Sequence, residues 1–326
     1  MRRRDLLVLG CAAAAWPLAS GAQQATVPVV AMLSGQSAEG YAFLAEALRL
    51  GLRDEGFVDG QNVKIEHRWA ASREEQLPSM AVELVNRPVA VLITGGSIWA
   101  TISAKAATAT IPIVFTTASD PVRLGFVASL NRPGGNVTGV SFLAAQLVVK
   151  RLELASQLVS KEIVIGFMGR SREPRYAADR KVIEDAAAKL GRKIVFLDVA
   201  DERDLEPSFT TAKRERVGVV IPLNDPFFMS HRRDLIALSA RNSLATIYES
   251  REPVAEGGLM SYGTSITGAY RQAGIYAGRI LKGEKPSDLP VVQSMRFESV
   301  INLKTAKALG LAIPHHMIVG ADEVIE

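Results

Sequence analysis

The chain has 326 residues, of which 48% are hydrophobic, and it carries a single cysteine and a formal net charge of +4. One cysteine excludes an internal disulfide framework and a thiolate zinc site. A chain of this length exceeds what a single hydrophobic core usually organises, so we expect two domains of moderate size.

The first 22 residues have the three blocks of an export signal. Residues 2–4 are arginines, residues 6–18 are apolar, and residues 20–22 supply the small side chains of a cleavage site. The apolar block is too short for a comfortable membrane span. The sequence therefore predicts a cleaved signal peptide at residues 1–22, a mature chain that begins near Gln23, and export to the periplasm by the general secretory or the twin-arginine route.

The leader also contains the cysteine, Cys11, so the mature chain has none. A lipoprotein cleavage site at Cys11 is disfavoured because the apolar block continues past it. Three of the 38 basic residues and one of the 34 acidic residues lie in the leader, which leaves 35 basic against 33 acidic residues. That near balance does not suit a nucleic-acid-binding protein, whose basic residues usually dominate.

Apolar runs typical of buried parallel strands alternate along the chain with amphipathic segments typical of helices. The first series has expected strands at residues 26–33, 63–69, 89–94, 111–115 and 137–142, and expected helices at residues 39–55, 74–86, 97–108 and 144–159. Residues 63–69 alternate polar and apolar side chains, so this strand is expected near a sheet edge.

A second series follows the same alternation. Its expected strands are residues 163–168, 193–198, 217–222 and 245–248, and its expected helices are residues 176–190, 205–214 and 229–242. A further helix at residues 266–281 is expected to return to the first lobe.

The predicted fold class is therefore α/β, with two doubly wound parallel-sheet lobes joined by a multi-strand hinge. We expect an N-terminal lobe of residues 23–141 plus about 264–292 and a C-terminal lobe of residues 142–263 plus about 293–326. Between the expected strand at 111–115 and the one at 137–142, the chain is rich in turn residues such as Asp120-Pro121 and Gly134-Gly135. Its apolar side chains predict a packed rim of the first lobe that leads into the first crossing to the second lobe, with Asp120 facing the cleft.

Ligands of open parallel sheets bind beyond the carboxyl ends of the strands. In this chain those ends are small and polar, and several lead into a helix N-terminus, which favours a carboxylate. They are Ser34-Gly35, Gly95-Gly96-Ser97, residues 116–120, Asn224-Asp225 and Tyr248-Glu249. A member such as Ser97 can equally serve only as a helix cap, and Asp120 or Asp225 can serve only in a turn. Five such ends together predict a cleft.

Sequence motifs of nucleotide-binding and hydrolytic enzymes are missing. The chain has no G-x-x-x-x-G-K-[ST] loop, no G-x-G-x-x-G after its first strand and no G-x-S-x-G elbow, and its four histidines are not spaced as metal ligands. We therefore expect no catalytic residues, no cofactor and no metal site.

Long stretches of the chain resemble the substrate-binding proteins of ABC importers, in the tryptophan/tyrosine-type branch. They include EALRLGLRDEGFVDGQNVKIEHRWA, IPIVFTTASDPVRLGFVASLNRPGGNVTGVSF, GGLMSYG and YRQAGIYAGRILKGEKPSDLPV. The resemblance implies a periplasmic-binding-protein fold of type I, a ligand held between two lobes by hinge closure, and ABC permease and ATPase subunits in the inner membrane as partners. A monomer is expected, without nucleic acid as a partner.

The resemblance also implies a set of ligand-binding residues. They are Ser34, Gly96, Ser97, Thr116, Thr117, Asp120, Ser141, Asn224, Asp225, Tyr248 and Tyr262. The expected ligand is an amino acid, aromatic or not, or another small carboxylate. Two other classes stay open at this point: a ligand sensor that docks on a membrane receptor, and a secreted α/β enzyme. A sugar-responsive repressor is disfavoured by the export signal and the missing DNA-binding head.

Overall fold

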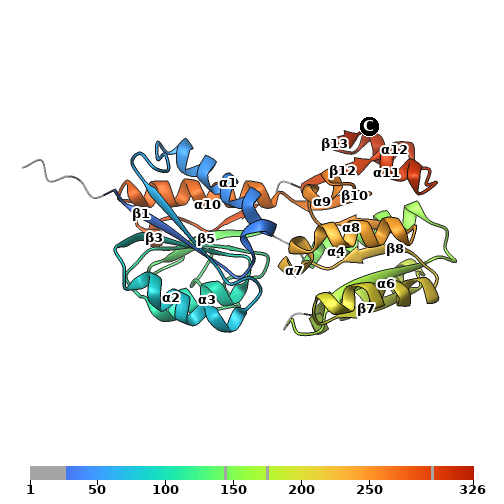
Figure 1. The fold of residues 1–326 in the computed structure, drawn as a ribbon, viewed down its shortest axis with the longest axis horizontal. Coiled ribbons are helices and arrows are strands. Elements are labelled where there is room, and N and C mark those ends of the chain that lie inside the picture. Colours follow the sequence, from blue (N-terminus) through green and yellow to red (C-terminus); the bar gives the residue numbers. More distant parts are fainter. Residues whose placement is uncertain (1–26, 143–144, 174–175, 295–296) are drawn as a thin grey trace, which may run out of the picture.

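The computed structural model describes residues 27–142, 145–173, 176–294 and 297–326. The predicted signal peptide, Cys11 and the expected mature start at Gln23 lie outside these described residues. The described chain forms two α/β lobes that stand side by side (Figure 1), each built around one sheet.

The first lobe is built on a six-stranded sheet in the order β11-β5-β4-β3-β1-β2, in which every pair of neighbours is parallel. Its strands are β1 (Val29–Ser34), β2 (Lys64–Trp69), β3 (Val89–Gly95), β4 (Ile113–Thr117), β5 (Val137–Phe142) and β11 (Val292–Ser294). Its helices are α1 (Ala38–Asp54), η1 (Glu74–Gln76), α2 (Leu77–Val85), α3 (Ile98–Ala107), α10 (Ile266–Leu281) and η3 (Pro286–Asp288). Helices α1 and α10 cover one face of the sheet, and α2 and α3 cover the other (Figure 1).

The second lobe is built on a seven-stranded sheet in the order β13-β12-β10-β9-β8-β6-β7. Its strands are β6 (Val164–Arg170), β7 (Ile194–Val199), β8 (Val217–Pro222), β9 (Ala245–Tyr248), β10 (Met260–Thr264), β12 (Phe297–Asn302) and β13 (Glu323–Ile325). Its helices are α4 (Ala145–Leu158), α5 (Tyr176–Leu190), η2 (Glu202–Asp204), α6 (Leu205–Arg214), α7 (Pro226–Ser230), α8 (Arg232–Arg241), α9 (Arg251–Ala255), α11 (Leu303–Ala308) and α12 (His315–Val319). Strands β10 and β12 run antiparallel, while the other pairs are parallel.

These sheets confirm the predicted fold class of two parallel α/β lobes, and β2 lies at a sheet edge as predicted. The expected helix at 229–242 is wrong as a single element. The side chain of Asp225 caps α7, which ends at Ser230; His231 interrupts the helix, and α8 begins at Arg232. Strands β10, β12 and β13 were not predicted, because short segments near the C-terminus lack a long apolar run.

Helices α1 and α10 pack at unusually close range, although more than 200 residues separate them in the sequence. A Cβ atom at Gly51 would overlap the carbonyl oxygen of Arg271, and one at Gly274 would overlap the carbonyl oxygen of Leu48. The glycines therefore let the two backbones touch. This contact fixes a late segment of the chain to the first lobe.

The chain passes between the two sheets three times, and two of these crossings flank α10. It crosses from β5 to α4, from β10 to α10, and from β11 to β12. The long connection between β4 and β5 belongs to the first lobe. Its Phe126 and Val127 are buried in the core beneath α3, and the ammonium group of Lys105 donates to the carbonyl oxygen of Phe126 at 3.1 Å.

The contact between α1 and α10 predicts a large effect of a small substitution. Gly51→Ala should lower the free energy of unfolding by about 1 to 3 kcal/mol, because the added methyl group forces two packed backbones apart. Thermal and urea unfolding of the purified protein measure this change.

Ala42→Leu is the matched control, since Ala42 lies on the exposed side of the same helix. It adds more atoms than Gly51→Ala, yet it should change the free energy of unfolding by less than about 0.5 kcal/mol. Equal effects of the two substitutions would contradict close packing as the cause.

Candidate ligand-binding cleft

A small cavity, with about 70 Å³ of room for water-sized molecules and partly open to solvent, lies between the lobes. The first lobe lines it with Gln36, Tyr41, Glu74, Gly96, Ser97, Ile98, Thr116, Thr117, Ala118, Ser119, Phe142, Ile266 and Tyr270. The second lobe lines it with Arg170, Glu173, Asn224, Asp225, Pro226 and Glu249. Most of the polar members follow the carboxyl ends of strands, where ligands of parallel sheets bind.

The turn between β3 and α3 forms the polar wall of the first lobe. Ser97 caps α3: its hydroxyl accepts from the backbone N–H of Trp99 at 3.2 Å and donates to Glu74 Oε1 at 2.7 Å. Gly96 has a φ of +70°, and a Cβ atom there would lie 2.7 Å from the hydroxyl oxygen of Ser34. Only glycine suits this position, and the turn presents the positive end of the α3 dipole to the cavity.

Two threonines and two tyrosines complete the first-lobe wall. Thr116 and Thr117 end β4, and the hydroxyl of Thr116 donates to the carbonyl oxygen of Thr94 at 3.3 Å. Tyr41 on α1 and Tyr270 on α10 are buried beside them. Together with Ile98, Phe142 and Ile266 they give the cavity an apolar side.

The second-lobe wall is dominated by carboxylates. Asp225 is 4% exposed, caps α7 by accepting from the N–H of Phe227 at 2.8 Å, and lies 3.6 Å from Arg170 Nε. The Asn224 amide donates to the Glu249 carboxylate. The guanidinium of Arg170 also lies over the Phe227 ring, 5.2 Å from its centroid. These contacts hold the charged groups in fixed positions.

Negatively charged side chains outnumber positively charged ones along the cavity. Four carboxylates line it, from Glu74, Glu173, Asp225 and Glu249, against the single guanidinium of Arg170. The pKa of Tyr41 is raised well above its ordinary value, chiefly by burial and further by Tyr270, Glu249 and Asp225. Glu249 and Asp225 belong to the other lobe, so their negative potential reaches across the cavity. A ligand with a cationic group fits such a field.

Six of the residues predicted for ligand binding line this cavity. They are Gly96, Ser97, Thr116, Thr117, Asn224 and Asp225. The structure thus brings together residues from three strand ends in two lobes. Their role in binding stays a prediction.

The other five predicted residues lie outside the cavity lining. Ser34 is buried behind Gly96, and its hydroxyl accepts from the N–H of Gln36. Ser141 is buried and donates to the carbonyl oxygen of Ser119 at 3.4 Å. Asp120 is exposed at the surface, where its carboxylate accepts from the N–H groups of Val122 and Arg123 and so stabilises a turn.

The two predicted tyrosines also lie elsewhere. Tyr248 is buried in the second lobe and lines a separate cavity together with Ser239 and Thr246. Tyr262 stacks on Phe297 at a centroid distance of 6.3 Å, next to the crossing from β10 to α10.

Several lining residues had not been predicted. Arg170 ends β6, so the rule of strand ends could have found it. Glu249 follows β9 and was named among the strand ends of the cleft, but not among the ligand-binding residues. Tyr41 and Tyr270 lie inside helices, where their spacing indicates only a buried face. They reach the cavity because α1 and α10 pack side by side.

The described residues hold no cluster of three or more His, Cys, Asp or Glu side chains that could bind a metal ion. Among the helices in the described ranges, none is long and apolar enough to cross a bilayer.

Two parallel-sheet lobes, three crossings and a cavity lined from both lobes at their strand ends define a two-lobed ligand-binding protein. The chain matches the family model described as ABC transporter substrate binding protein over residues 5–325. The chain therefore belongs to the ABC transporter substrate-binding proteins. These proteins bind a ligand and do not transform it, which confirms the prediction that the chain is not an enzyme.

A similar protein and a similar solved structure are consistent with membership of this family. A tyrosine-binding protein from Clostridioides difficile is 28% identical over 260 residues, which cover 80% of this chain and 74% of the relative. A structure of an ABC domain in complex with L-Trp from Streptococcus pneumoniae is 25% identical, covers 91% of this chain and 99% of its own, and superposes with a TM-score of 0.79. This likeness confirms the periplasmic-binding-protein fold of type I.

A second solved structure differs more. The ligand-free, open structure of a substrate-binding protein with adhesive properties from Clostridium difficile is 24% identical, covers 92% of this chain and 99% of its own, and has a TM-score of 0.65. Identity and coverage are nearly equal for the two solved structures.

The buried tyrosines at the cavity predict a loss of stability at alkaline pH. Burial raises the pKa of Tyr270 to about 12. Because an unfolded tyrosine titrates near 10, the free energy of unfolding should be unaffected by this group below pH 10 and should fall as the pH rises toward 12.

Urea unfolding at a series of pH values measures this fall. In Tyr270→Phe the loss over that interval should be smaller by up to roughly 2 to 3 kcal/mol, because the ionisable group is gone. Parallel pH curves for the wild type and Tyr270→Phe would show that Tyr270 does not titrate as described.

Proposed function

We propose that this protein captures a free α-amino acid in the cavity between its lobes and delivers it, from the periplasm, to the permease and ATPase of an ABC importer. Membership of the substrate-binding family supports the transport role. The choice of ligand depends on one observation: one cavity wall suits a negatively charged group, and the opposite wall suits a positively charged group.

The two walls suit the two charged groups of an amino acid. The turn before α3 offers backbone N–H groups and the positive end of a helix dipole to a carboxylate. Across the cavity, the carboxylates of Asp225 and Glu249 suit an ammonium group. A ligand that carries both groups touches both lobes at once, and such a ligand favours the closed arrangement.

The apolar side of the cavity suits a hydrophobic side chain. Tyr41, Tyr270 and Phe142 lie there beside two isoleucines. Aromatic rings pack well against one another and against such walls. The relative named as a tyrosine-binding protein and the solved complex with L-Trp favour an aromatic amino acid over an aliphatic one.

The proposed lobes follow the two sheets to within a few residues. The N-terminal lobe comprises residues 23–141 and about 264–292, and the C-terminal lobe comprises residues 142–263 and about 293–326. The place of β11 in the first sheet and of β12 in the second supports the last of these boundaries. The protein acts as a monomer in this proposal. A sensor that docks on a receptor would share the fold, and transport assays in a strain that lacks the gene separate the two roles.

The proposed ligand can be tested by calorimetry with L-tryptophan and L-tyrosine. Glu249→Gln should weaken the binding of either amino acid about 10-fold to 100-fold, because the ammonium group loses a charged partner while the shape is kept. Glu184→Gln is the matched control: Glu184 is exposed on α5 of the same lobe, and its substitution should leave the affinity unchanged.

A ligand without the ammonium group sharpens this test. The wild type should bind 3-indolepropionate far more weakly than L-tryptophan, and Glu249→Gln should reduce that preference. Equal affinity of the wild type for both compounds would argue against the proposed recognition of an ammonium group. A full panel of amino acids in a thermal-shift assay should show specific ligands, since a hundredfold excess over Kd stabilises by about 2.7 kcal/mol.

Export predicts a shortened chain in the periplasm. The basic, apolar and small-residue blocks occur in the order of a signal peptide, so the mature protein should begin within a few residues of Gln23. N-terminal sequencing of the periplasmic fraction checks this expectation. Recovery of exported protein that retains Met1 would refute it.

A further inference from the structure

The lobes touch directly at a place where no ligand is needed to join them. The hydroxyl of Ser230, at the end of α7, donates to Gln36 Oε1 at 2.9 Å. Close by, Arg232 Nη1 donates to the carbonyl oxygen of Gly40 at 3.1 Å. Gln36 and Gly40 belong to the first lobe, and Ser230 and Arg232 belong to the second.

Arg232 is held ready for this contact by its own lobe. Its side chain is 7% exposed, and its Nε and Nη2 donate to Glu256 Oε1 at 3.0 and 2.8 Å. Its guanidinium also lies 5.6 Å from the ring centroid of Phe43, a first-lobe residue on α1. Two contacts to the first lobe thus depend on one buried cation, and a charge-assisted hydrogen bond of this kind is among the stronger ones in proteins.

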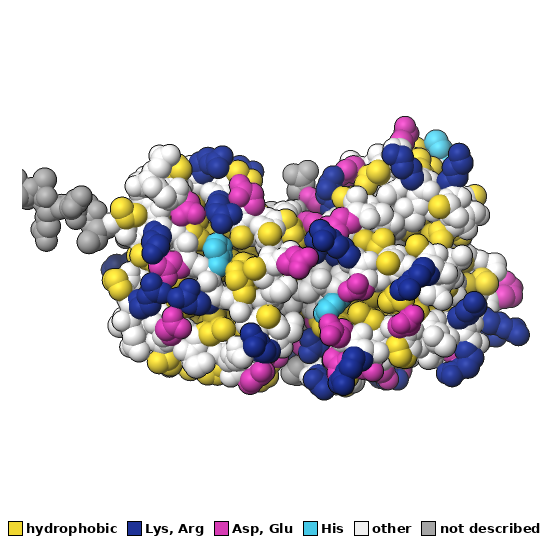
Figure 2. Space-filling model, viewed as in Figure 1, with side chains coloured by type: hydrophobic (Ala, Val, Ile, Leu, Met, Phe, Trp, Pro, Cys, Tyr) yellow, Lys and Arg dark blue, Asp and Glu magenta, His cyan; other side chains and the backbone are white. Residues whose placement is uncertain are grey.

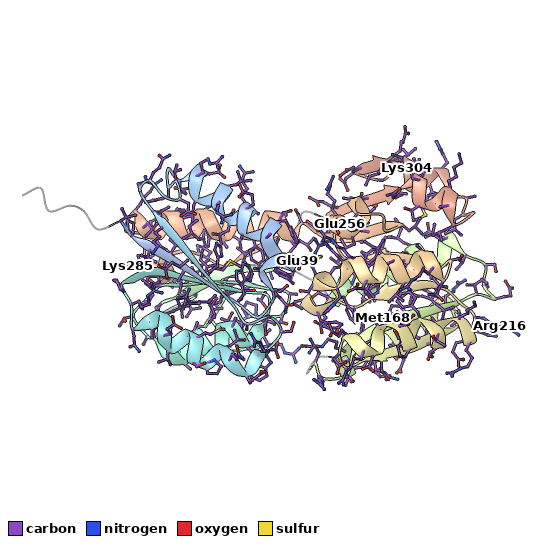
Figure 3. All side chains as sticks on the ribbon, in the orientation of Figure 1. Glu39, Met168, Arg216, Glu256, Lys285 and Lys304 are labelled. Atoms are coloured by element: carbon purple, nitrogen blue, oxygen red, sulfur yellow. The ribbon has the colours of Figure 1, made fainter. Side chains whose placement is uncertain are left out.

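Surface charges surround this buried contact. Arg233 lies between two carboxylates, 3.7 Å from Glu39 of the first lobe and 3.4 Å from Glu256 of the second. Figure 3 shows Glu39 and Glu256 on either side of the boundary between the lobes, and Figure 2 shows acidic and basic side chains gathered where the lobes meet. Exposed pairs of this kind contribute little energy, so the buried Arg232 is the main member.

Gly40 favours the close approach of the two lobes. It lies in the first turns of α1, where alanine would favour the helix by roughly 0.5 to 1 kcal/mol. A Cβ atom there would lie 3.0 Å from the hydroxyl oxygen of Ser230 and 3.1 Å from its Cα atom. The helix therefore lacks a side chain at the point where the other lobe contacts it.

Gln36 connects this contact to the ligand cavity. Its amide nitrogen donates to the carbonyl oxygen of Gly96 at 2.7 Å, in the turn that forms the polar wall, while its amide oxygen accepts from Ser230. Gln36 lines the ligand cavity, whereas Gly40, Ser230 and Arg232 line a second, outer cavity between the lobes. The contacts thus form the partition that separates the ligand from the outer cavity.

We propose that Gln36, Gly40, Ser230 and Arg232 form an interlobe latch that sets the population of the closed state and thereby tunes affinity without touching the ligand. The latch rests on the proposed closure of the lobes. The apparent Kd of a protein that binds in its closed state rises in proportion as that state becomes rarer. Loss of the Arg232 contact should therefore lower the ratio of closed to open protein about 10-fold. The Kd should rise by the factor by which the closed fraction falls.

The test measures the distance between the lobes in ligand-free protein. The mature chain has no cysteine, so spin labels can be attached at Ser79→Cys on α2 and Glu206→Cys on α6, two exposed positions in different lobes. Double electron–electron resonance should find a closed and an open population in the labelled wild type. Arg232→Gln should shift the balance to the open one, and Arg241→Gln, at the far exposed end of the same helix, should not.

Because Arg232→Gln also loses hydrogen bonds inside its own lobe, a bulky side chain placed between the lobes provides an independent variant. Gly40→Leu leaves Arg232 intact, suits the helix, and places its side chain against Ser230. It should also shift the labelled protein to the open population. Wild-type distance distributions in both variants would overturn the latch, and so would a ligand-free wild type that is already fully open.

Calorimetry with L-tryptophan links the latch to affinity. Its Kd should rise in Arg232→Gln and Gly40→Leu by the factor that the distance measurement gives, and should stay unchanged in Arg241→Gln. An unchanged Kd in variants that are shifted to the open population would overturn the role in affinity. Failure of every variant and of the wild type to bind L-tryptophan would count against the proposed ligand, while the distance measurement would still decide the latch.

Discussion

The contact between α1 and α10 is the constraint on which the architecture depends. Two glycines remove the side chains that would keep these helices apart, so a segment near residue 270 is bound to one near residue 50. Because α10 is fixed to the first lobe while β10 and β12 belong to the second, the chain must cross between the lobes on both sides of α10. With the earlier crossing after β5, this gives three linking segments, which suit opening and closing better than a single flexible linker does.

The same contact also shapes the site. Tyr41 and Tyr270 lie on the two helices and form the apolar side of the cavity, while the strand ends of both sheets supply its polar walls. The pKa of Tyr41 is raised chiefly by burial, and the negative charges of Glu249 and Asp225 in the second lobe raise it further. The lobes are therefore coupled electrically as well as through the latch contacts of Ser230 and Arg232.

Much of this fold could be predicted from the sequence, because alternating apolar runs and amphipathic segments fix the identity of parallel strands and helices. The return of the helix at 266–281 was expected, and its boundaries match α10. The division of residues 229–242 was missed because the cap at Asp225 and the break at His231 involve few residues. The short strands β10, β12 and β13 depend on pairing with distant segments, which no local pattern reveals.

The sequence predicted part of the cavity lining, because sheet topology alone places some of these residues. Residues at strand ends, such as Ser97 and Asp225, are placed by sheet topology alone, and the structure brings them to one cavity. Asp120 also follows a strand, yet its carboxylate is used by the turn that it begins, and it remains at the surface. Gln36 could not be recognised from the sequence, because its importance depends on Gly96 in one lobe and Ser230 in the other.

Native mass spectrometry of the protein purified from its natural host tests the central proposal, that the cavity holds one amino acid between the lobes. The expected result is a single additional mass per chain that corresponds to an α-amino acid, is released on unfolding and is recovered chemically unchanged after rebinding. A bound molecule without an amino group, or a bound molecule that the protein converts to another compound, would contradict the claim.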